Sequence, residues 1–404
     1  MSVPYRPILS ALLRNRAGAL LVALQISIAL AVLVNAVYIV KLRVDRIGRP
    51  TGIDVENIFV VSSTGFTRDF NYAATLEEDL TYLRRLPGAT GATPVNTVPL
   101  SGGGSSTVLM QRPDMEAGVK SYNYFMVDED GINALGLRML AGRWFRQDEI
   151  EPPPATAQDV YAARIVVTKA LADELFPNDD ALGKTVYMIQ GRPVVIIGIV
   201  EHMLGAWLMR KNAEQVYYIP RKPYGPSVRY LVRTQAGQRD NLMSKVEAEL
   251  STLNRGRSID FVRTLELYKN RSYLADRNMG IFLVVTTTLL LAITCLGIFG
   301  LATFNVSTRT KQIGTRRAVG ARRGDIVRHF LVENWMISTG GVLVGCVLAL
   351  AAGHWLSLEY ELPRVDLYYL VGGVLALWAL GVGAAWQPAR RAAKISPAIA
   401  TRTA

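Results

Sequence analysis

Four long apolar runs constrain this chain more than any other feature. Each lacks Asp, Glu, Lys and Arg, and they occupy residues 17–40, 280–306, 335–355 and 367–386. A bilayer core of about 30 Å requires about 20 apolar residues in a helix. A helix at the surface of a soluble domain keeps a polar face, so runs that are apolar all round predict four transmembrane helices.

The first run could instead be the core of a cleaved secretory signal, because Arg14 and Arg16 precede it. A signal core, however, spans only ~7 to 15 residues and ends at a small-x-small cleavage site. Here the apolar run is longer, and Lys41 and Arg43 follow it directly. We therefore expect this run to stay in the protein as a helix.

The formal net charge of +12 is concentrated beside the apolar runs. Residues 50–278 contain 26 Lys and Arg against 27 Asp and Glu, whereas the rest of the chain contains 19 against 6. Basic residues beside membrane helices act as topology signals and contact lipid headgroups. This distribution leaves no basic face for nucleic acid, so we expect membrane lipids as partners and no nucleic acid.

Loop charges predict the orientation of the helices. Residues 307–334 and the tail after Trp386 are rich in Lys and Arg, whereas the 356–366 loop is mainly acidic. The positive-inside rule places the basic loop and tail in the cytoplasm and the acidic loop outside. With four helices, both termini are then cytoplasmic and residues 41–278 are translocated.

The translocated segment has the pattern of a folded α+β domain. Short β-rich runs predict strands at 58–61, 165–167, 194–199 and 216–219. Apolar residues spaced three and four apart predict helices at 170–176 and 241–253. Cys295 and Cys346 are the two cysteines and both lie in apolar runs, so we expect no disulfide in this domain.

Two further features of this segment concern its organisation. Turn-rich breaks at 101–106 and 151–154 predict surface loops and suggest an inserted subdomain at about 105–215. Residues 264–278 favour a helix, and no Gly or Pro separates them from the second apolar run until Gly280. We expect a stiff stalk there, since a rod can transmit displacement and a flexible linker cannot.

The sequence contains no motif of an enzyme or of a resident cofactor. Gly183-Lys184-Thr185 resembles the end of a phosphate-binding loop, but Asn178 stands where GxxxxGK[ST] requires a glycine. GxSxG and HExxH are absent, and a surface role for His202 is a simpler interpretation than a catalytic or metal-binding one. We therefore predict no catalytic, cofactor-binding or metal-binding residue, and any ATP-driven role requires a partner.

The basic segment at 309–334 carries the most information. It predicts a short basic helix, a glycine break at Gly320 and a second helix that runs into the third membrane span. Asp325 lies where an acidic residue favours a helix start, and Ile326, Phe330 and Leu331 form an apolar stripe. From the residues alone, an ordinary basic cytoplasmic loop remains an alternative.

This segment resembles the signature of the FtsX-like permease family, which includes MacB-type transporters and lipoprotein-releasing permeases. The family pattern R-x-x-E-I-G-x-R-R-A-x-G-A, followed by D-I and F-L-x-E, is matched from Arg309 to Glu333 except that Gln312 replaces the acidic residue. The tail at 388–397 is similar to the family's P-A-R-R-A-A-x-x-x-P. Residues 136–143, 166–176 and 182–200 are similar to its periplasmic core domain, in which Gly183 would form a turn before a strand.

The resemblance implies an α-helical membrane protein with four transmembrane helices and a large α+β extracytoplasmic domain between the first and second. Its expected segments are 1–49 (cytoplasmic N-terminus, first span and stalk), 50–263 (periplasmic core domain), 264–306 (stalk and second span), 307–334 (coupling segment), 335–386 (third and fourth spans) and 387–404 (cytoplasmic tail).

The resemblance also implies a function and partners. Such permeases pair as homodimers or heterodimers in the inner membrane and bind a cytoplasmic ABC ATPase, which holds ATP and Mg. Closure of the ATPases is transmitted to the periplasmic domains to export or extrude a peptide, antibiotic or lipoprotein, in some systems with a periplasmic membrane-fusion adaptor. The ATPase-coupling residues would be Gln312, Ile313, Gly314, Arg316, Arg317, Gly320, Ala321, Arg322 and Asp325.

Two other functions stay open from the sequence. The same coupling could regulate periplasmic cell-wall hydrolases, or the chain could be a sensor that signals to a cytoplasmic partner without transport. A neighbouring gene for an ABC ATPase would count against the sensor. A neighbouring gene for a periplasmic adaptor would favour export.

Overall fold

The computed structural model describes residues 16–114, 120–153, 160–223, 225, 227–360 and 363–396. The chain forms two compact units. We call Met1–Gly48 together with Ala275–Ala404 the helical bundle, and Arg49–Leu274 the inserted domain.

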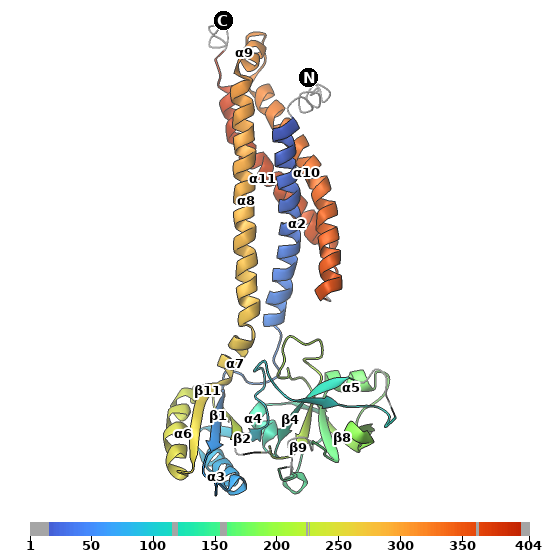
Figure 1. Ribbon diagram of the computed structural model, residues 1–404, viewed down its shortest axis with the longest axis vertical. Coiled ribbons are helices and arrows are strands. Elements are labelled where there is room, and N and C mark those ends of the chain that lie inside the picture. Colours follow the sequence, from blue (N-terminus) through green and yellow to red (C-terminus); the bar gives the residue numbers. More distant parts are fainter. Residues whose placement is uncertain are drawn as a thin grey trace. The chain divides into compact units, whose positions relative to one another are not determined.

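The elements of the helical bundle are α2 (Arg16–Ile47), α8 (Leu274–Thr308), α9 (Thr310–Ala318), α10 (Arg323–Tyr360) and α11 (Leu367–Ala393). In the helical bundle, α8 to α11 follow one another through short connections, whereas the inserted domain separates α2 from α8 in the chain (Figure 1). Within the described ranges, α2, α8, α10 and α11 are long and apolar enough to cross a membrane. The four predicted spans are thus confirmed, and each helix extends beyond its apolar run.

Small and polar side chains bring α2 and α10 close together. A Cβ atom on Gly341 would lie 2.6 Å from the carbonyl oxygen of Ala23, so only glycine permits this approach. Ser27 Oγ donates a hydrogen bond of 2.8 Å to the Gly341 carbonyl, and Asn35 Nδ2 donates one of 3.1 Å to the Ala349 carbonyl. Such contacts hold helices together in lipid, where apolar burial alone does not.

The helix α8 is tied to α2 by a charged contact near its start. The Asp276 side chain is only 3% exposed and forms an ion pair with Arg43 of α2. Arg46 lies 3.8 Å from the same carboxylate. Farther along α8, large apolar side chains such as Phe282, Leu289 and Leu296 are exposed. One face of α8 is therefore unpartnered within the described part of this single chain.

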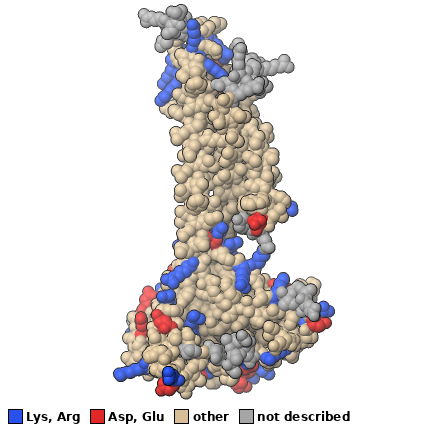
Figure 2. All heavy atoms as spheres, viewed as in Figure 1, with Lys and Arg blue, Asp and Glu red and all other residues tan. Residues whose placement is uncertain are grey.

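Charge on the bundle is confined to its ends. Figure 2 shows an uncharged surface along most of its length and a concentration of Lys and Arg at the end that carries α9. This pattern is that of a membrane-spanning bundle with a basic rim at one interface.

The inserted domain has two lobes, and the first is a four-stranded antiparallel sheet in the order β11-β1-β10-β2. Its elements follow the chain as β1 (Ile58–Gly65), α3 (Tyr72–Arg85), β2 (Ala89–Val95), β10 (Ser227–Thr234), α6 (Arg239–Leu253) and β11 (Arg257–Thr264). This is the β-α-β-β-α-β arrangement of ferredoxin-like folds. The two helices bury Leu76, Leu80 and Val246 against sheet residues such as Phe59 and Tyr230.

The second lobe is inserted between β2 and β10, where a ferredoxin-like fold has a hairpin. Its sheet follows the order β3-β4-β9-β6-β8-β5, with β7 paired to β8. The elements are β3 (Ser106–Val108), β4 (Ser121–Val127), α4 (Gly131–Leu135), β5 (Met139–Gly142), η1 (Gln147–Glu149), β6 (Arg164–Thr168), α5 (Lys169–Leu175), β7 (Thr185–Tyr187), η2 (Ile189–Gly191), β8 (Pro193–Val200) and β9 (Val216–Pro220). The helix α5 packs on this sheet through Leu171 and Leu175.

The predicted strands at 58–61, 165–167, 194–199 and 216–219 are confirmed as parts of β1, β6, β8 and β9. The predicted helices at 170–176 and 241–253 correspond to α5 and α6. The strands of the second sheet lie within residues 106–220. The inserted subdomain is predicted at about 105–215, so the two ranges nearly coincide.

The predicted stalk differs from expectation, because the structure divides it into two helices. The helix α7 (Leu265–Ser272) ends before Tyr273, and α8 begins at Leu274. Tyr273 is only 1% exposed, and its backbone ψ of 2° departs from helical geometry. A buried tyrosine therefore interrupts a segment that contains no Gly or Pro to mark the break.

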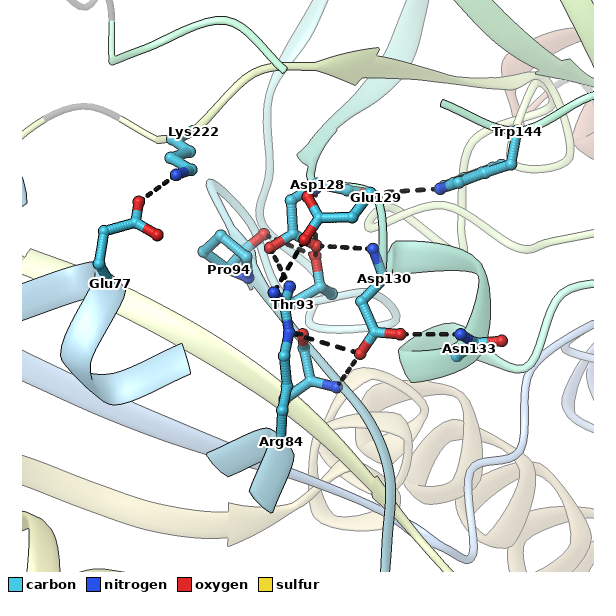
Figure 3. A network of polar contacts seen from close by, with 11 residues as sticks. Glu77, Arg84, Thr93, Pro94, Asp128, Glu129, Asp130, Asn133, Trp144 and Lys222 are labelled. Carbon is cyan, nitrogen blue, oxygen red and sulfur yellow. Dashed lines mark hydrogen bonds and ion pairs between the residues drawn. The ribbon is translucent and has the colours of Figure 1, made fainter. Parts of the chain in front are cut away.

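A polar network joins the two lobes of the inserted domain (Figure 3). Arg84 of α3 donates to the carboxylates of Asp128, at 2.5 Å, and Glu129, at 2.9 Å. Thr93 Oγ1 of β2 donates to Asp128 Oδ1 at 2.8 Å, and the Ala92 amide donates to Asp130 Oδ2 at 2.7 Å. Three consecutive acidic residues after β4 thus bind the first lobe directly.

Burial controls the ionisation of Asp128. The residue is 1% exposed, and this burial raises the pKa of its carboxyl to about 7, although Arg84 and the Thr93 hydroxyl oppose the rise. The negative charges of Glu129 and Asp130 also raise the pKa of Asp128, because like charges disfavour ionisation.

Candidate functional site

The candidate site is the corner between α9 and α10, residues 309–326, which we call the α9–α10 corner. The helix α9 ends in a left-handed turn, since Gly320 has φ +100°. The Ala321 amide donates to the Arg316 carbonyl and the Gly320 amide to the Arg317 carbonyl, both at 3.1 Å. These two bonds form a Schellman motif, in which a glycine after the helix cap satisfies the last carbonyls. The predicted glycine break is therefore confirmed.

The start of α10 is capped within the same turn. Asp325 Oδ2 accepts a hydrogen bond of 3.0 Å from the Arg322 amide. An acidic residue in the first helical turn also interacts favourably with the helix dipole, as the sequence predicts. Both helix ends are thus satisfied within residues 316–325, and the turn is well defined.

The inner side of the corner is apolar. Ile313 is 4% exposed, and Gly314 beside it is also buried. The buried residues of this cluster come from three helices and are Ile313, Ile326, Phe330, Ala389, Ala392 and Ala393. The apolar stripe of α10 therefore packs on α9 and on the last turns of α11, and it holds the three helices as one group.

Polar contacts strengthen the same group. The Arg317 guanidinium donates a hydrogen bond to the carbonyl of Ile395, which follows α11. Arg309, between α8 and α9, lies 3.0 Å from the Glu333 carboxylate of α10, and the Glu333 side chain is only 4% exposed. A buried carboxylate needs a charged partner. This ion pair therefore holds the connection between α8 and α9 against α10.

The outer side of the corner carries the remaining predicted residues. Gln312, Arg316 and Arg322 are exposed. Val319 is 84% exposed, although it is a large apolar residue. Exposed donors together with an exposed aliphatic side chain are suited to a contact with another protein.

The structure thus divides the nine predicted coupling residues into three sets. Ile313, Gly314 and Arg317 face inward; Gly320, Ala321 and Asp325 build the turn; Gln312, Arg316 and Arg322 face outward. The prediction did not include Arg309, Glu333 or Ile395, although the matched motif and tail contain all three. Their pairing depends on contacts between segments 24 and 78 residues apart in the chain.

Two motifs of the inserted domain have structural explanations. Gly183 has φ +77° in a turn before β7, which confirms the predicted turn before a strand. Glu201 forms an ion pair with Arg138, and His202 Nε2 lies 2.9 Å from the Pro50 carbonyl oxygen. The Glu201-His202 pair is therefore occupied by contacts within the domain.

Comparison with known protein families gives one match for the inserted domain and one for the helical bundle. The FtsX-like permease C-terminal family matches residues 284–397, which include the α9–α10 corner, and the MacB-like periplasmic core domain family matches residues 19–252. With four membrane helices and an inserted α/β domain, the chain has the construction of an ABC transporter permease. It belongs to the FtsX-like permease family and carries a MacB-like periplasmic core domain.

Individual relatives agree with this assignment. The macrolide export ATP-binding/permease protein MacB of Neisseria gonorrhoeae is 24% identical over 358 residues, which are 86% of this chain and 52% of that protein. The uncharacterized ABC transporter permease YknZ of Bacillus subtilis is 28% identical over 293 residues, which are 68% of each chain. The chain spans about half the length of the MacB relatives it matches.

Two solved domain structures align with part of this chain. The periplasmic region of MacB from Actinobacillus actinomycetemcomitans covers 55% of this chain and 94% of its own, with 17% identity and a TM-score of 0.34. The extracellular domain of the YknZ transporter covers 50% of this chain and 100% of its own, with 15% identity and a TM-score of 0.31.

Proposed function

We propose that this permease converts ATP hydrolysis by a separate cytoplasmic ABC ATPase into a conformational change of the inserted domain, which drives export of a substrate such as a peptide, antibiotic or lipoprotein. The observation that carries the proposal is the two-sided α9–α10 corner. Its inner side is fixed to α10 and α11, while its outer side presents the exposed donors of Gln312, Arg316 and Arg322 and an exposed Val319. Such a corner can receive a displacement from a partner and pass it to three membrane helices.

The contacts of α8 support a path from the corner to the inserted domain. One end of α8 leads into α9 through Arg309, which is paired with Glu333. Near the other end, Asp276 is paired with Arg43 of α2. Since α2 and α8 are the two helices that connect covalently to the inserted domain, these ion pairs couple both connections to the corner. No movement of substrate through the bundle is required.

The partner would bind through the outward residues. Arg316 and Arg322 offer planar guanidinium donors that match carboxylates and helix C-termini. Gln312 is neutral where related permeases have an acid, so this position would accept or donate a neutral hydrogen bond to the ATPase. ATP and Mg would be bound by that ATPase, as the ATP-binding/permease name of the MacB relatives suggests.

A second permease copy and the membrane orientation complete the proposal. The exposed apolar face of α8 would pack on a second permease, as a homodimer or heterodimer. The basic α9 end would be cytoplasmic, with both termini inside and the inserted domain in the periplasm, where a membrane-fusion adaptor could bind. The protein would then be a multi-pass protein of the bacterial inner membrane.

Orientation can be tested by thiol labelling. In a variant without Cys295 and Cys346, single cysteines at Ser105 and Glu359 should react with an impermeant reagent added to intact spheroplasts. A cysteine at Gly324 should react only after the membrane is opened. Reaction of the Gly324→Cys variant in intact spheroplasts would contradict the cytoplasmic position of the corner.

The coupling itself is tested by purification of the tagged full chain from its native membrane. We expect an ABC ATPase to copurify, and ATP hydrolysis to be absent from the chain when it is purified alone. Val319→Ser and Arg316→Ala should reach the membrane in normal amount and lose the ATPase. Arg364→Ala, an exposed arginine in the 361–366 connection, is the matched control. Retention of the ATPase by both corner variants would refute the proposed interface.

A further inference from the structure

A groove between α10 and α11 is not explained by the proposed coupling. It is an open hollow of about 510 Å³ whose apolar walls include Val327, Leu331 and Trp335 of α10, and Val382 and Trp386 of α11. These three α10 residues recur every four positions, so they lie along one face of that helix. The groove is therefore a continuous apolar surface at the edge of the bundle.

The groove extends along α11 away from the α9 end. A second hollow of about 520 Å³ shares Trp335, Val382 and Trp386 and continues to Trp378. The rings of Trp335 and Trp378 lie 6.0 Å apart between centroids. From Trp378 to Arg390, twelve residues of helix span about 18 Å. This length is close to one leaflet, which is about half of a 30 Å hydrocarbon core.

Two arginine side chains lie at one end of the groove. Arg328 of α10 and Arg390 of α11 line it and are exposed. The Arg390 guanidinium lies 5.2 Å from the centroid of the Trp386 ring. Across the described ranges, no carboxylate lies within ion-pair distance of either arginine. Two unneutralised guanidinium groups at the end of an apolar groove are complementary to a negative headgroup attached to an acyl chain.

We propose that this groove binds one anionic phospholipid. Its acyl chain lies along Trp335, Val382 and Trp386, and its headgroup phosphate is held by Arg328 and Arg390. Guanidinium groups bind phosphate oxygens through paired donors, and tryptophan is favoured where the hydrocarbon meets the headgroups. The site is distinct from the outward residues of the α9–α10 corner, so lipid and ATPase can bind together.

Native mass spectrometry of the detergent-purified full chain tests the site. We expect phosphatidylglycerol to be retained about tenfold more strongly than phosphatidylcholine, given two arginines near the headgroup. Arg328→Gln with Arg390→Gln should abolish this preference. The matched control is Arg323→Gln with Arg391→Gln, which removes the same charge from exposed neighbours that do not line the groove. If both double variants lost the preference for phosphatidylglycerol equally, the preference would depend on general surface charge and the proposal would be overturned.

A second measurement needs no variant. Phosphatidylglycerol with a photoreactive acyl chain, incorporated into membranes that contain the wild-type protein, should cross-link to peptides with Trp335, Val382 or Trp386. Cross-links confined to the exposed face of α8 would contradict the proposed site. Absence of lipid adducts at these three residues would show that lipid does not occupy the groove, as expected if a second permease covers it, and would also refute the proposal. Inorganic phosphate should not compete with the lipid, since the acyl chain contributes to binding.

Discussion

Arg317 of α9 donates a hydrogen bond to the main-chain carbonyl of Ile395, whereas the side chain of its neighbour Arg316 is exposed. Adjacent residues on a helix point about 100° apart, so the two arginines have different surroundings. One stabilises the corner from inside, and the other is available to a partner.

The first prediction separates these two roles. Arg317→Ala should reduce the thermal stability of the purified full chain, because loss of a charged hydrogen bond costs about 1.5 to 3 kcal/mol. Arg316→Ala should reduce stability less, because its side chain is exposed, and should weaken ATPase binding. Thermal unfolding and copurification measured on both variants check this. If Arg316→Ala were the destabilising substitution, the inward and outward assignments would be wrong.

The second prediction concerns the turn at Gly320. Its φ of +100° lies in a region that β-branched residues avoid. No atom would obstruct an added Cβ there, so strain is confined to the backbone. Gly320→Val should therefore distort the α9–α10 corner and lower ATPase association, while Gly320→Asn should be closer to wild type because asparagine tolerates this region. Equal activity of all three proteins would show that the turn geometry is unimportant.

The third prediction concerns the buried ion pair of the first lobe. Arg257 is fully buried against Asp79, whose Oδ2 also accepts a hydrogen bond of 2.7 Å from the Tyr230 hydroxyl. Arg257→Ala should destabilise the inserted domain by about 3 to 5 kcal/mol, since it leaves a buried carboxylate uncompensated. Asp173→Ala breaks an exposed pair with Lys169 and should cost less than about 1 kcal/mol. Urea unfolding of the three proteins provides the comparison.

The fourth prediction is a pH dependence caused by Asp128. Its carboxyl has a pKa of about 7 in the folded domain, against 3.8 ordinarily. Between these values the folded state holds more protons than the unfolded state, so the stabilisation is present at low pH and is lost as pH rises toward 7. The slope from this residue approaches about 1.4 kcal/mol per pH unit.

Asp128→Asn tests this assignment, because asparagine resembles the protonated acid and does not titrate. Urea unfolding followed by fluorescence should show a weaker loss of stability with pH in the variant than in the wild type. Trp144 is a suitable reporter, since its Nε1 donates to the Asp128 carbonyl at 3.2 Å. An unchanged pH slope would mean that Arg84 keeps Asp128 ionised in the folded protein.

The extent to which the sequence predicts this structure depends on the range of the interactions. The membrane helices follow from apolar length, and the α9–α10 turn follows from Gly320 and Asp325, which act within a few residues. The inward position of Arg317 depends on the tail after α11, and the helix break at Tyr273 depends on burial of that ring. Neither has a local signal in the sequence.

The pairing of β2 with β10 is also nonlocal, and it has a consequence for the evolution of the inserted domain. Val95, the last residue of β2, pairs with Arg229 near the start of β10. The chain therefore leaves and re-enters the first lobe at neighbouring points, as at a hairpin. A second lobe joined in this way can be lengthened, replaced or shortened to a tight turn without a change in the four-stranded sheet of the first lobe. Insertions of different length at this point would therefore leave the β11-β1-β10-β2 sheet intact.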